Sequence, residues 1–143
     1  MKKIYLASPF FDATECHYYH RAIEALRSAG YEVYVPQEHS IEGGWEMPNE
    51  EWARRVFAED VDAIRTSDVV MILNFGMYSD SGTAWECGYA KGLGTAVVQV
   101  LCGEPNTAYS MMMISSADKV VPFDNVGLFN KCSPINLDDV IQK

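Results

Sequence analysis

The sequence predicts a single α/β domain: a doubly wound, mostly parallel five-stranded sheet with flanking helices, of the flavodoxin-like or Rossmann-like kind. Three observations support this fold class. Residues 69–73 are all apolar, which is typical of a strand buried on both faces of a parallel sheet. Runs of strand length alternate with segments of helical periodicity. The 143 residues contain no repeat and no low-complexity linker, so we expect one domain over residues 1–143.

The elements of the first half follow one another closely. A strand is expected at residues 3–7 and a helix at residues 13–29, which a glycine ends. A short second strand at residues 31–35 stops at a proline. Residues 37–48 have no periodicity, and we expect a loop that is long enough to suggest function.

The second half repeats the pattern. A helix at residues 49–66 leads to the buried strand at residues 69–73. A loop at residues 74–81 then leads to a helix that ends near residues 92–94. The remaining elements are expected to be a strand, a helix, a strand and a helix, at residues 95–101, 107–115, 119–121 and 136–142.

Parallel strands end at one edge of the sheet, so the loops after the first four strands should meet there. These loops comprise residues 8–11, 37–45, 74–81 and the segment that begins at Cys102. They contain no Lys or Arg. We expect one ligand pocket at this edge, with Ser8, Phe10, Phe11 and Gln37 contributing from the first two loops.

Charge and missing motifs exclude several classes of function. The formal net charge of −9 argues against nucleic-acid polymers and anionic membranes as partners. No apolar run is as long as a membrane span, and residues 1–3 lead directly into a strand, so we expect no signal peptide and a cytoplasmic protein. The turn after the first strand has no glycine, and no P-loop or nucleophile-elbow motif occurs.

The cysteines and histidines do not predict a metal site. The four cysteines form no CxxC pair, which favours reduced thiols. Cys16, His17 and His20 share one predicted helix and could imitate a metal-binding set. Three candidates on the flank of one helix are more typical of surface or boundary residues, so we expect no metal.

Glu86 lies where the buried strand hands over to the next helix, the usual position for ligands in an open α/β sheet. With Thr83 it forms a Thr-x-x-Glu capping pattern, in which the glutamate binds only a backbone N–H. A chemical role is the alternative, because Asp80 adds a second acid and Gly82 leaves room for a ligand. In the first helical turn the helix dipole favours the ionised carboxylate, which suits a nucleophile.

Asp60 is a further candidate acid. Its spacing from Phe57 and Ile64 places it on the apolar stripe of its helix. That stripe is expected to face inward and comprises Ala53, Val56, Phe57, Val61 and Ile64. A buried acid is costly unless it is paired or used. The alternative is that Asp60 lies at the edge of the stripe and is hydrogen-bonded to backbone.

A pair of acids close together points to one class of chemistry. Burial of Asp60 near Glu86 would raise one of the two pKa values and provide a protonated acid beside an ionised base. Such a pair serves glycosyl transfer through a covalent intermediate. A pocket floored by aromatic side chains would suit an aromatic base as leaving group, and the candidates are Tyr5, Phe10, Trp85 and Tyr89.

Over nearly its whole length the chain resembles the nucleoside 2-deoxyribosyltransferase family. The most specific part is the spacing of Asp80 and Glu86 ahead of Gly88-Tyr89-Ala90. The other matching segments are residues 4–7 with Phe10 and Phe11, residues 34–36, and Asp60 ahead of residues 67–68.

The resemblance implies a pentosyltransferase that exchanges the bases of 2′-deoxyribonucleosides in two steps, with retention and without a cofactor. Glu86 would form the covalent deoxyribosyl intermediate, Tyr5 would orient its carboxylate, and Asp60 would bind the base and relay its proton. Asp80 would contact the 5′-hydroxyl end of the sugar. The implied partners are nucleosides, free nucleobases and further copies of the chain, in a tetramer or hexamer whose neighbouring subunits complete each site. The implied role is nucleoside salvage.

One departure leaves a second function open. Where the transferases commonly have an asparagine before two apolar residues, this chain has Ser110. A serine there is similar to the related nucleoside 5′-monophosphate N-glycosidases, which hold a phosphate with serines. Asp80 argues against a phosphate, because like charges ~4 Å apart repel by roughly a few kcal/mol in a partly dry site. We therefore expect a nucleoside as substrate, with a deoxynucleoside 5′-monophosphate N-glycosidase as the alternative.

Three further alternatives stay open at this point. A non-enzymatic binding module, with Glu86 as a helix cap only, would share the fold. The methionines at residues 111–113 either provide adaptable packing or flank a neighbour's pocket, with Met112 against the substrate. Trp45 and Trp52 either line the base site or anchor their loop.

Overall fold

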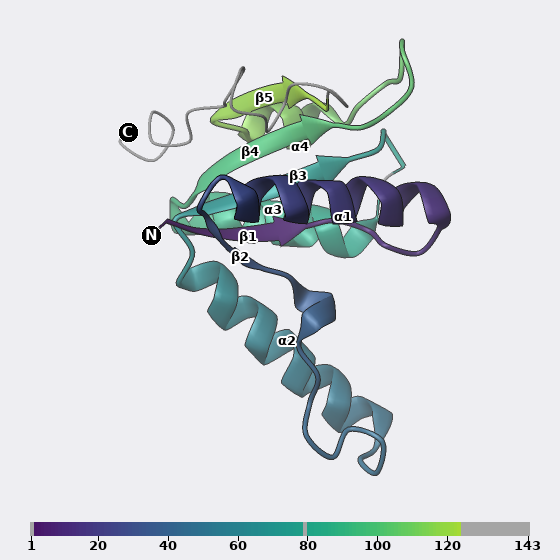
Figure 1. The fold of residues 1–143 in the computed structure, drawn as a ribbon, viewed down its shortest axis with the longest axis vertical. Helices are drawn as coiled ribbons and strands as arrows, with labels where there is room; N and C mark the ends of the chain where they lie inside the picture. Colours follow the sequence, from purple (N-terminus) through teal and green to yellow (C-terminus); the bar gives the residue numbers. More distant parts are fainter. Residues whose placement is uncertain (1, 79, 124–143) are drawn as a thin grey trace.

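The computed structural model describes residues 2–78 and 80–123, and its centre is one five-stranded sheet (Figure 1). The strand order is β2-β1-β3-β4-β5, and every neighbouring pair is parallel. The predicted fold class is confirmed, with a sheet that is wholly rather than mostly parallel. The strands are β1 (Lys3–Ala7), β2 (Glu32–Tyr34), β3 (Val69–Asn74), β4 (Ala96–Leu101) and β5 (Lys119–Pro122).

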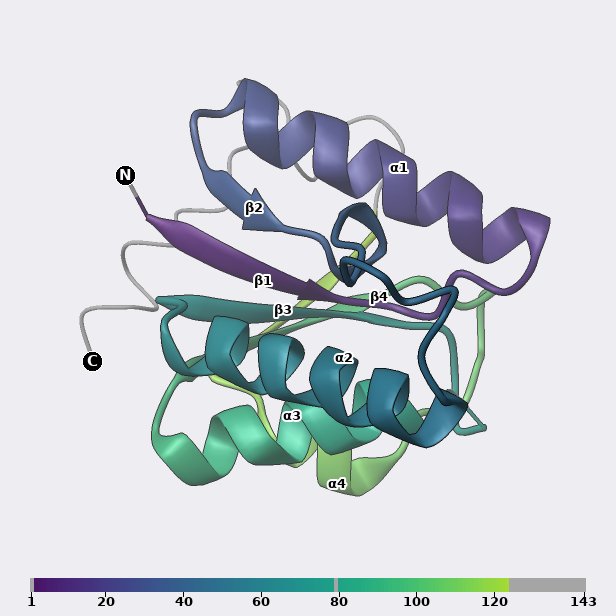
Figure 2. The same ribbon diagram turned by 90° about the horizontal axis from the view of Figure 1, so that it is seen from below.

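The helices lie on both faces of the sheet (Figure 2). Helix α1 (Ala13–Ser28) covers one face, and α2 (Asn49–Arg65), α3 (Ser81–Leu93) and α4 (Met111–Ser116) lie on the other. Right-handed crossovers require this division, because the chain moves outward from β1 to β2 and then reverses to β3. The reversal places the topological switch point of the sheet between β1 and β3. No helix within the described residues is long and apolar enough to cross a membrane.

Two apolar clusters pack against the central strand β3, whose six residues are all buried. The cluster beneath α1 contains Tyr19 and Leu26. The cluster beneath α3 contains Tyr5, Ile64 and Cys87. Because side chains alternate along a strand, Tyr5 points to the face that α3 covers, away from the cluster beneath α1. This alternation decides which strand residues can reach the site.

Most predicted bounds agree with the structure to within one or two residues, but the helix predicted at residues 107–115 begins only at Met111. Residues 107–110 belong to no helix or strand and follow a turn at residues 105–106, in which the Thr107 amide donates to the Glu104 carbonyl at 3.0 Å. Asn106 in that turn has a left-handed φ of 67°. The helix predicted at residues 136–142 lies outside the described residues.

The inward stripe predicted for α2 is also wrong in part. Ala63 and Ile64 are buried in the last turns of the helix, whereas Ala53 and Phe57 are exposed. Figure 1 shows the reason: α2 diverges from the sheet, so that its first turns project beyond the edge of the strands. The described part of the chain therefore leaves Ala53 and Phe57 of the stripe exposed and buries Val56 and Val61 only in part.

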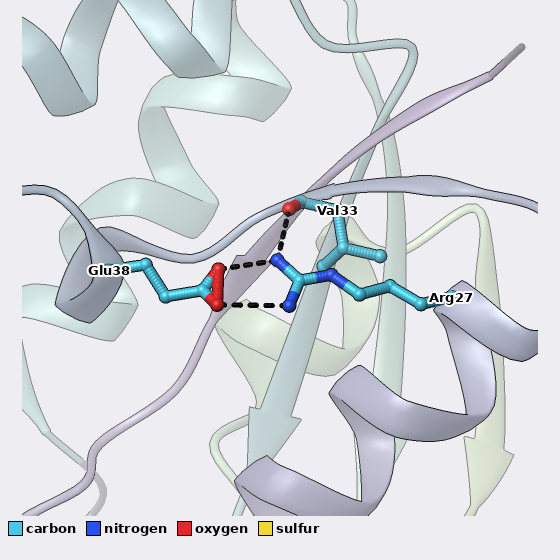
Figure 3. Close-up of polar contacts among 3 residues, drawn as sticks. All are labelled: Arg27, Val33 and Glu38. Atoms are coloured by element: carbon cyan, nitrogen blue, oxygen red, sulfur yellow. Dashed lines mark hydrogen bonds and ion pairs between the residues drawn. The ribbon is translucent and has the colours of Figure 1, made fainter.

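A 3-10 turn, η1 (Pro36–Glu38), begins the long loop after β2 and is tied to α1 by Arg27 (Figure 3). Arg27 Nη1 donates to Glu38 Oε2 at 2.9 Å, and Nη2 bonds the other carboxylate oxygen of Glu38. Nη2 also donates to the Val33 carbonyl at 3.1 Å. One guanidinium therefore holds the end of β2 and the start of the loop against the last turn of α1.

Candidate active site

Two side chains meet next to the switch point of the sheet. Tyr5 on β1 is fully buried, and its hydroxyl donates a hydrogen bond to Oε2 of Glu86 on α3. Glu86 is partly buried. Removal from water also raises the pKa of the Tyr5 hydroxyl, so that Tyr5 stays a proton donor to the carboxylate. The hydrogen bond fixes the direction of the Glu86 carboxylate.

Glu86 is not a helix cap. The N-cap of α3 is Asp80, whose Oδ2 accepts hydrogen bonds from the Thr83 amide at 2.8 Å and the Thr83 hydroxyl at 3.0 Å. Thr83 is therefore a residue of the first helical turn, and Glu86 lies beyond that turn. The alternative in which Glu86 only satisfies a backbone N–H is wrong.

Burial raises the pKa of Glu86 to about 7. The Tyr5 hydroxyl acts in the opposite direction because it stabilises the carboxylate, whereas the charges of Asp60 and Asp80 raise the pKa further. The three acids thus lie close enough to interact electrostatically. The helix dipole, which we expected to keep Glu86 ionised, is outweighed because its effect fades beyond the first turn.

Asp60 approaches the same region from α2. Its Oδ1 accepts a hydrogen bond from the Tyr34 hydroxyl at 3.4 Å, so a side chain rather than backbone is its partner. Partial burial raises the pKa of Asp60, and the charge of Glu59 adds to this effect. The Tyr34 hydroxyl and the nearby His39 lower it. Asp60 therefore holds a proton more readily than an ordinary aspartate.

Each of the two acids, Glu86 and Asp60, accepts a hydrogen bond from one of two stacked tyrosines. The rings of Tyr5 and Tyr34 lie 5.4 Å apart at 14°, and His39 stacks on Tyr34 at 4.2 Å and 12°. Burial and the charge of Asp60 raise the pKa of Tyr34 to about 12, so its hydroxyl remains a donor at neutral pH. Sequence reasoning did not single out Tyr34 or His39 as site residues. Tyr34 could have been identified from its pairing with Tyr5 across β1 and β2. That pairing depends on the strand register, which the sequence does not give.

Comparison with known proteins now identifies the family. A family model for nucleoside 2-deoxyribosyltransferases matches residues 4–125. The chain belongs to this family. The 2-deoxyribosyltransferase of the psychrotolerant bacterium Bacillus psychrosaccharolyticus has a similar structure, with a TM-score of 0.79 and 28% identity over 96% of this chain and 95% of that chain. Membership in this transferase family supports an enzyme that acts on nucleosides.

More distant structures share the fold alone. A conserved protein from Enterococcus faecalis V583 has a TM-score of 0.69 and 20% identity, over 99% of this chain and 98% of that chain. A CMP N-glycosidase from Clostridium botulinum has a TM-score of 0.56 and 20% identity, over 85% of this chain and 89% of that chain. Among curated proteins, none matches this chain.

The remaining candidate residues of this deoxyribosyltransferase-family chain lie in or beside the loops at the carboxyl ends of the strands. Ser8 is buried and donates to the Pro9 carbonyl at 2.8 Å. Gln37 is exposed within η1. Gly82 lies in the first turn of α3, where a Cβ would come within 3.1 Å of Asp80 Oδ2. Ser110 is the N-cap of α4 and makes no capping hydrogen bond with its side chain.

The four rings expected to floor one pocket lie in separate groups. Phe10 stacks on Tyr19 at 5.5 Å, within the cluster beneath α1, and on the exposed Phe11 at 5.6 Å. Trp85 stacks on Tyr89 at 5.2 Å where α2 meets α3. The four rings therefore form no single stack: Tyr5 stacks on Tyr34 beside Glu86, and Phe10 packs with the cluster beneath α1.

The exposed fractions of the methionine and tryptophan side chains bear on the alternatives left open for these residues. Met113 is buried, whereas Met111 and Met112 are each 77% exposed, so packing among the described residues accounts for the third methionine and not for the first two. Trp45 is fully exposed. Trp52 lies against its own loop, since a Cβ on Gly44 would come within 3.0 Å of the indole.

The helix that carries Cys16 presents its histidines to solvent. His17 and His20 are both exposed on α1. Within residues 2–78 and 80–123, no group of three or more His, Cys, Asp or Glu side chains is arranged to hold a metal ion.

Proposed function

We propose that this chain exchanges the base of a 2′-deoxyribonucleoside through a covalent deoxyribosyl intermediate on Glu86, without a cofactor, in cytoplasmic nucleoside salvage. The observation that carries the proposal is the hydrogen bond from the Tyr5 hydroxyl to Glu86 Oε2. It fixes the direction of a partly buried carboxylate that interacts electrostatically with a second acid, Asp60, beside the switch point of the sheet. Family membership supports the same assignment.

The reaction divides into two displacements at the sugar carbon C1′. A Glu86 oxygen bonds to C1′ as the C1′–N bond breaks, and the departing base takes a proton from Asp60. A second base then bonds to C1′ through its nitrogen, the ester bond to Glu86 breaks, and Asp60 recovers a proton. The raised pKa of Asp60 supports its part, and the Tyr5 hydroxyl stabilises the free carboxylate.

The acidic loops favour a nucleoside over a nucleotide. The four loops at the carboxyl ends of β1 to β4, residues 8–12, 35–48, 75–80 and 102–110, contain no Lys or Arg. We call them the acidic rim, after the acids Asp12, Glu38, Glu42, Glu46, Asp80 and Glu104. Of these acids, Glu38 forms an ion pair with Arg27 of α1. A phosphate group would meet like charges there, which is unfavourable.

The contacts to the sugar and base are part of the proposal. Asp80 would bind the 5′-hydroxyl end of the sugar. Further substrate contacts would come from Ser8, Phe10, Phe11, Gln37, Gly82, Ser110 and Met112.

A deoxynucleoside 5′-monophosphate N-glycosidase is the second candidate, and Ser110 is the observation that favours it. Its hydroxyl is partly exposed at the start of α4 and makes no capping hydrogen bond, so it is available to a phosphate. The acidic rim opposes that assignment.

We also propose that copies of the chain associate, as a tetramer or hexamer in which a neighbour completes each site. An apolar patch, which we call the α2–α3 patch, comprises Phe57 and Trp85, which are 55% and 47% exposed. Phe57 and Trp85 contact edge to face at 5.2 Å. Exposed apolar patches of this kind mark interaction sites, and Trp85 directly precedes Glu86. A second copy seated there would lie next to the site.

Base exchange is tested by incubating the protein with deoxythymidine and adenine and separating the products. Deoxyadenosine is the expected product, and mass spectrometry of protein incubated with nucleoside alone should find one deoxyribosyl group on the peptide that contains Glu86. Glu86→Ala is the control. No exchange with any common pair of bases at high enzyme concentration would discard the proposal. Faster base release from a monophosphate than from a nucleoside, without an acceptor, would select the second candidate.

A further inference from the structure

A line of polar side chains crosses the core beside the site, and no step of the proposed reaction uses it. Its first part joins β3 to β4 and α3. The Gly76 amide donates to Asn74 Oδ1 at 3.1 Å, and Asn74 Nδ2 donates to Gln99 Oε1 at 3.1 Å. Gln99 Nε2 donates to Cys87 Sγ at 3.2 Å. Asn74 and Gln99 are completely buried, and Cys87 is 2% exposed.

The line continues from α3 to α4. Cys87 Sγ lies 3.4 Å from Ser116 Oγ, and the Ser116 hydroxyl donates to the Met113 carbonyl at 2.7 Å. Because the single hydroxyl proton of Ser116 is used on that carbonyl, the Cys87 thiol is the donor to Ser116. Every hydrogen bond in the line therefore points the same way, from the backbone amide of Gly76 to the carbonyl of Met113.

The fixed ends determine the orientation of both buried amides. A backbone N–H can only donate, so the atom of Asn74 that faces Gly76 is its oxygen, and its nitrogen faces Gln99. The Gln99 nitrogen must then face Cys87. Apolar residues of the same shape can replace such a buried line at little cost in stability. What an apolar replacement loses is the single arrangement that the hydrogen bonds enforce.

This arrangement bears directly on Glu86, because it gives α3 a second side-chain anchor. Glu86 accepts from Tyr5 on β1, and its neighbour Cys87 accepts from Gln99 on β4. The central strand β3 lies between these two strands. Neighbouring helix residues point about 100° apart, so the bonds from Tyr5 to Glu86 and from Gln99 to Cys87 hold α3 from two directions around its axis. A roll of the helix that would move Glu86 away from Tyr5 must also break the bond to Gln99.

The same line reaches two other segments of the candidate site. At one end, Gly76 lies in the loop that leads to Asp80. At the other, Ser116 belongs to α4, the helix that Ser110 precedes. A continuous set of hydrogen bonds thus fixes the relative positions of three segments: the loop after β3, helix α3 and helix α4.

We propose that Gln99 and Asn74 are positioning residues for the reaction at Glu86, acting through Cys87 on α3 and through Gly76 on the loop before Asp80. This inference rests on the proposed function, because its kinetic test measures the rate of base exchange. Neither residue touches the substrate; each limits where the Glu86 carboxylate and the Asp80 loop can lie. A displacement of about 1 Å in a catalytic group can cost on the order of a hundredfold in rate.

The test compares Gln99→Met, which keeps the length of the side chain and removes its polar atoms, with Val98→Ala on the other face of the same strand. Val98 is buried in the cluster beneath α1 and makes no part of the line. We expect Gln99→Met to lower kcat for base exchange by about 10- to 100-fold, with KM within about threefold of wild type. Val98→Ala should change kcat by less than about twofold at a similar loss of stability, measured by urea unfolding.

A second pair of variants keeps the test decisive if Gln99→Met fails to fold. Cys87→Ser retains a group that accepts from Gln99 and donates to Ser116, and it should keep kcat within about threefold of wild type. Cys87→Ala removes both bonds and should fall toward the kcat expected for Gln99→Met. Equal kcat for Gln99→Met and Val98→Ala at equal stability, or equal kcat for the two Cys87 variants, would overturn the proposal.

If the wild-type chain exchanges no bases, the proposed function fails by itself and the positioning role is decided by hydrogen exchange. Gln99→Met frees the Asn74 amide to rotate, so the Gly76 amide proton should exchange faster than in wild type and in Val98→Ala. An unchanged exchange rate at Gly76 would reject the positioning role.

Discussion

Helices α1 and α2 differ in what covers them, although they have 16 and 17 residues and both carry an apolar stripe. Helix α1 begins with a capping box between Asp12 and Glu15, and it buries Tyr19 and Leu26 to 2% exposure or less. Helix α2 follows Pro48 without a side-chain cap and buries Ala63 and Ile64 near its end. Helix α1 therefore completes the apolar core, whereas α2 exposes part of its apolar stripe, including Phe57.

The difference between the two helices reflects a difference between the two faces of the sheet: the candidate catalytic acid Glu86 lies on the face that α3 covers, not on the face that α1 covers. The α1 face contains apolar packing, which favours the folded state. The α3 face contains Glu86, whose burial disfavours its charged form. The exposed Phe57 of α2 contacts Trp85, the residue before Glu86. We therefore expect substitutions in the cluster beneath α1 to change the free energy of unfolding, and substitutions of Glu86 or of the exposed Phe57 to change activity or association.

The largest effect should come from Glu86→Gln. This substitution keeps the size of the side chain and removes the proposed nucleophile, so base exchange should fall by at least about a thousandfold. Product formation at saturating substrate is the measurement, and circular dichroism should find the fold unchanged. Retention of more than a tenth of the activity would mean that the α3 face does not supply the nucleophile.

The second effect separates the two helices directly. Leu26→Ala on α1 should lower the free energy of unfolding by about 2–4 kcal/mol, because it leaves a cavity in the core. Phe57→Ala on α2 should lower the stability of an isolated chain by less than about 1 kcal/mol, because its ring is 55% exposed. It should instead shift the assembly toward smaller species in analytical ultracentrifugation. Similar losses of stability and no change in mass would contradict the division.

The third effect is a dependence on pH. Glu86 has a folded-state pKa of about 7 against an ordinary value of 4.5, so the folded chain binds more protons than the unfolded chain between these values. This group therefore lowers the stability of wild type as pH rises through that window. Glu86→Gln should be more stable than wild type by about 3 kcal/mol at pH 8, with little gain near pH 4, where Glu86 is mostly protonated in both states.

The same titration predicts the direction of the activity profile. Wild-type kcat/KM should rise with pH through about 7, as the nucleophile ionises. Tyr5→Phe should move this rise to higher pH, because the lost hydroxyl had lowered the pKa of Glu86. A profile that is flat from pH 5 to 9 would exclude a buried carboxylate as nucleophile.

The smallest effect is expected at the Arg27–Glu38 pair, on the α1 side of the sheet. Both side chains are more than 40% exposed, and an exposed ion pair contributes at most about 1 kcal/mol to stability. Arg27→Gln should therefore lower the free energy of unfolding by less than about 1 kcal/mol, measured at low and high salt. A loss of several kcal/mol would show that the loop after β2 contributes to the core.

The sequence predicts much of this arrangement because its strongest signals are local. The apolar run from Val69 predicts the central strand, and parallel topology then brings Tyr5 and Glu86 to one region. The residues that were missed depend on register: Tyr34 matters because it pairs with Tyr5, and Gln99 because it lies level with Ile72 on β3. Periodicity also predicts that α2 has an apolar stripe, but not whether this chain or another molecule covers it.

The acidic rim has a consequence that precedes any contact with the site. Nucleotides and inorganic phosphate are multiply charged anions, and the rim repels them over a distance of about 8 Å at physiological ionic strength. A neutral nucleoside approaches without that repulsion. We therefore expect the rim to favour the approach of uncharged nucleosides over phosphorylated compounds before shape or hydrogen bonding has any influence.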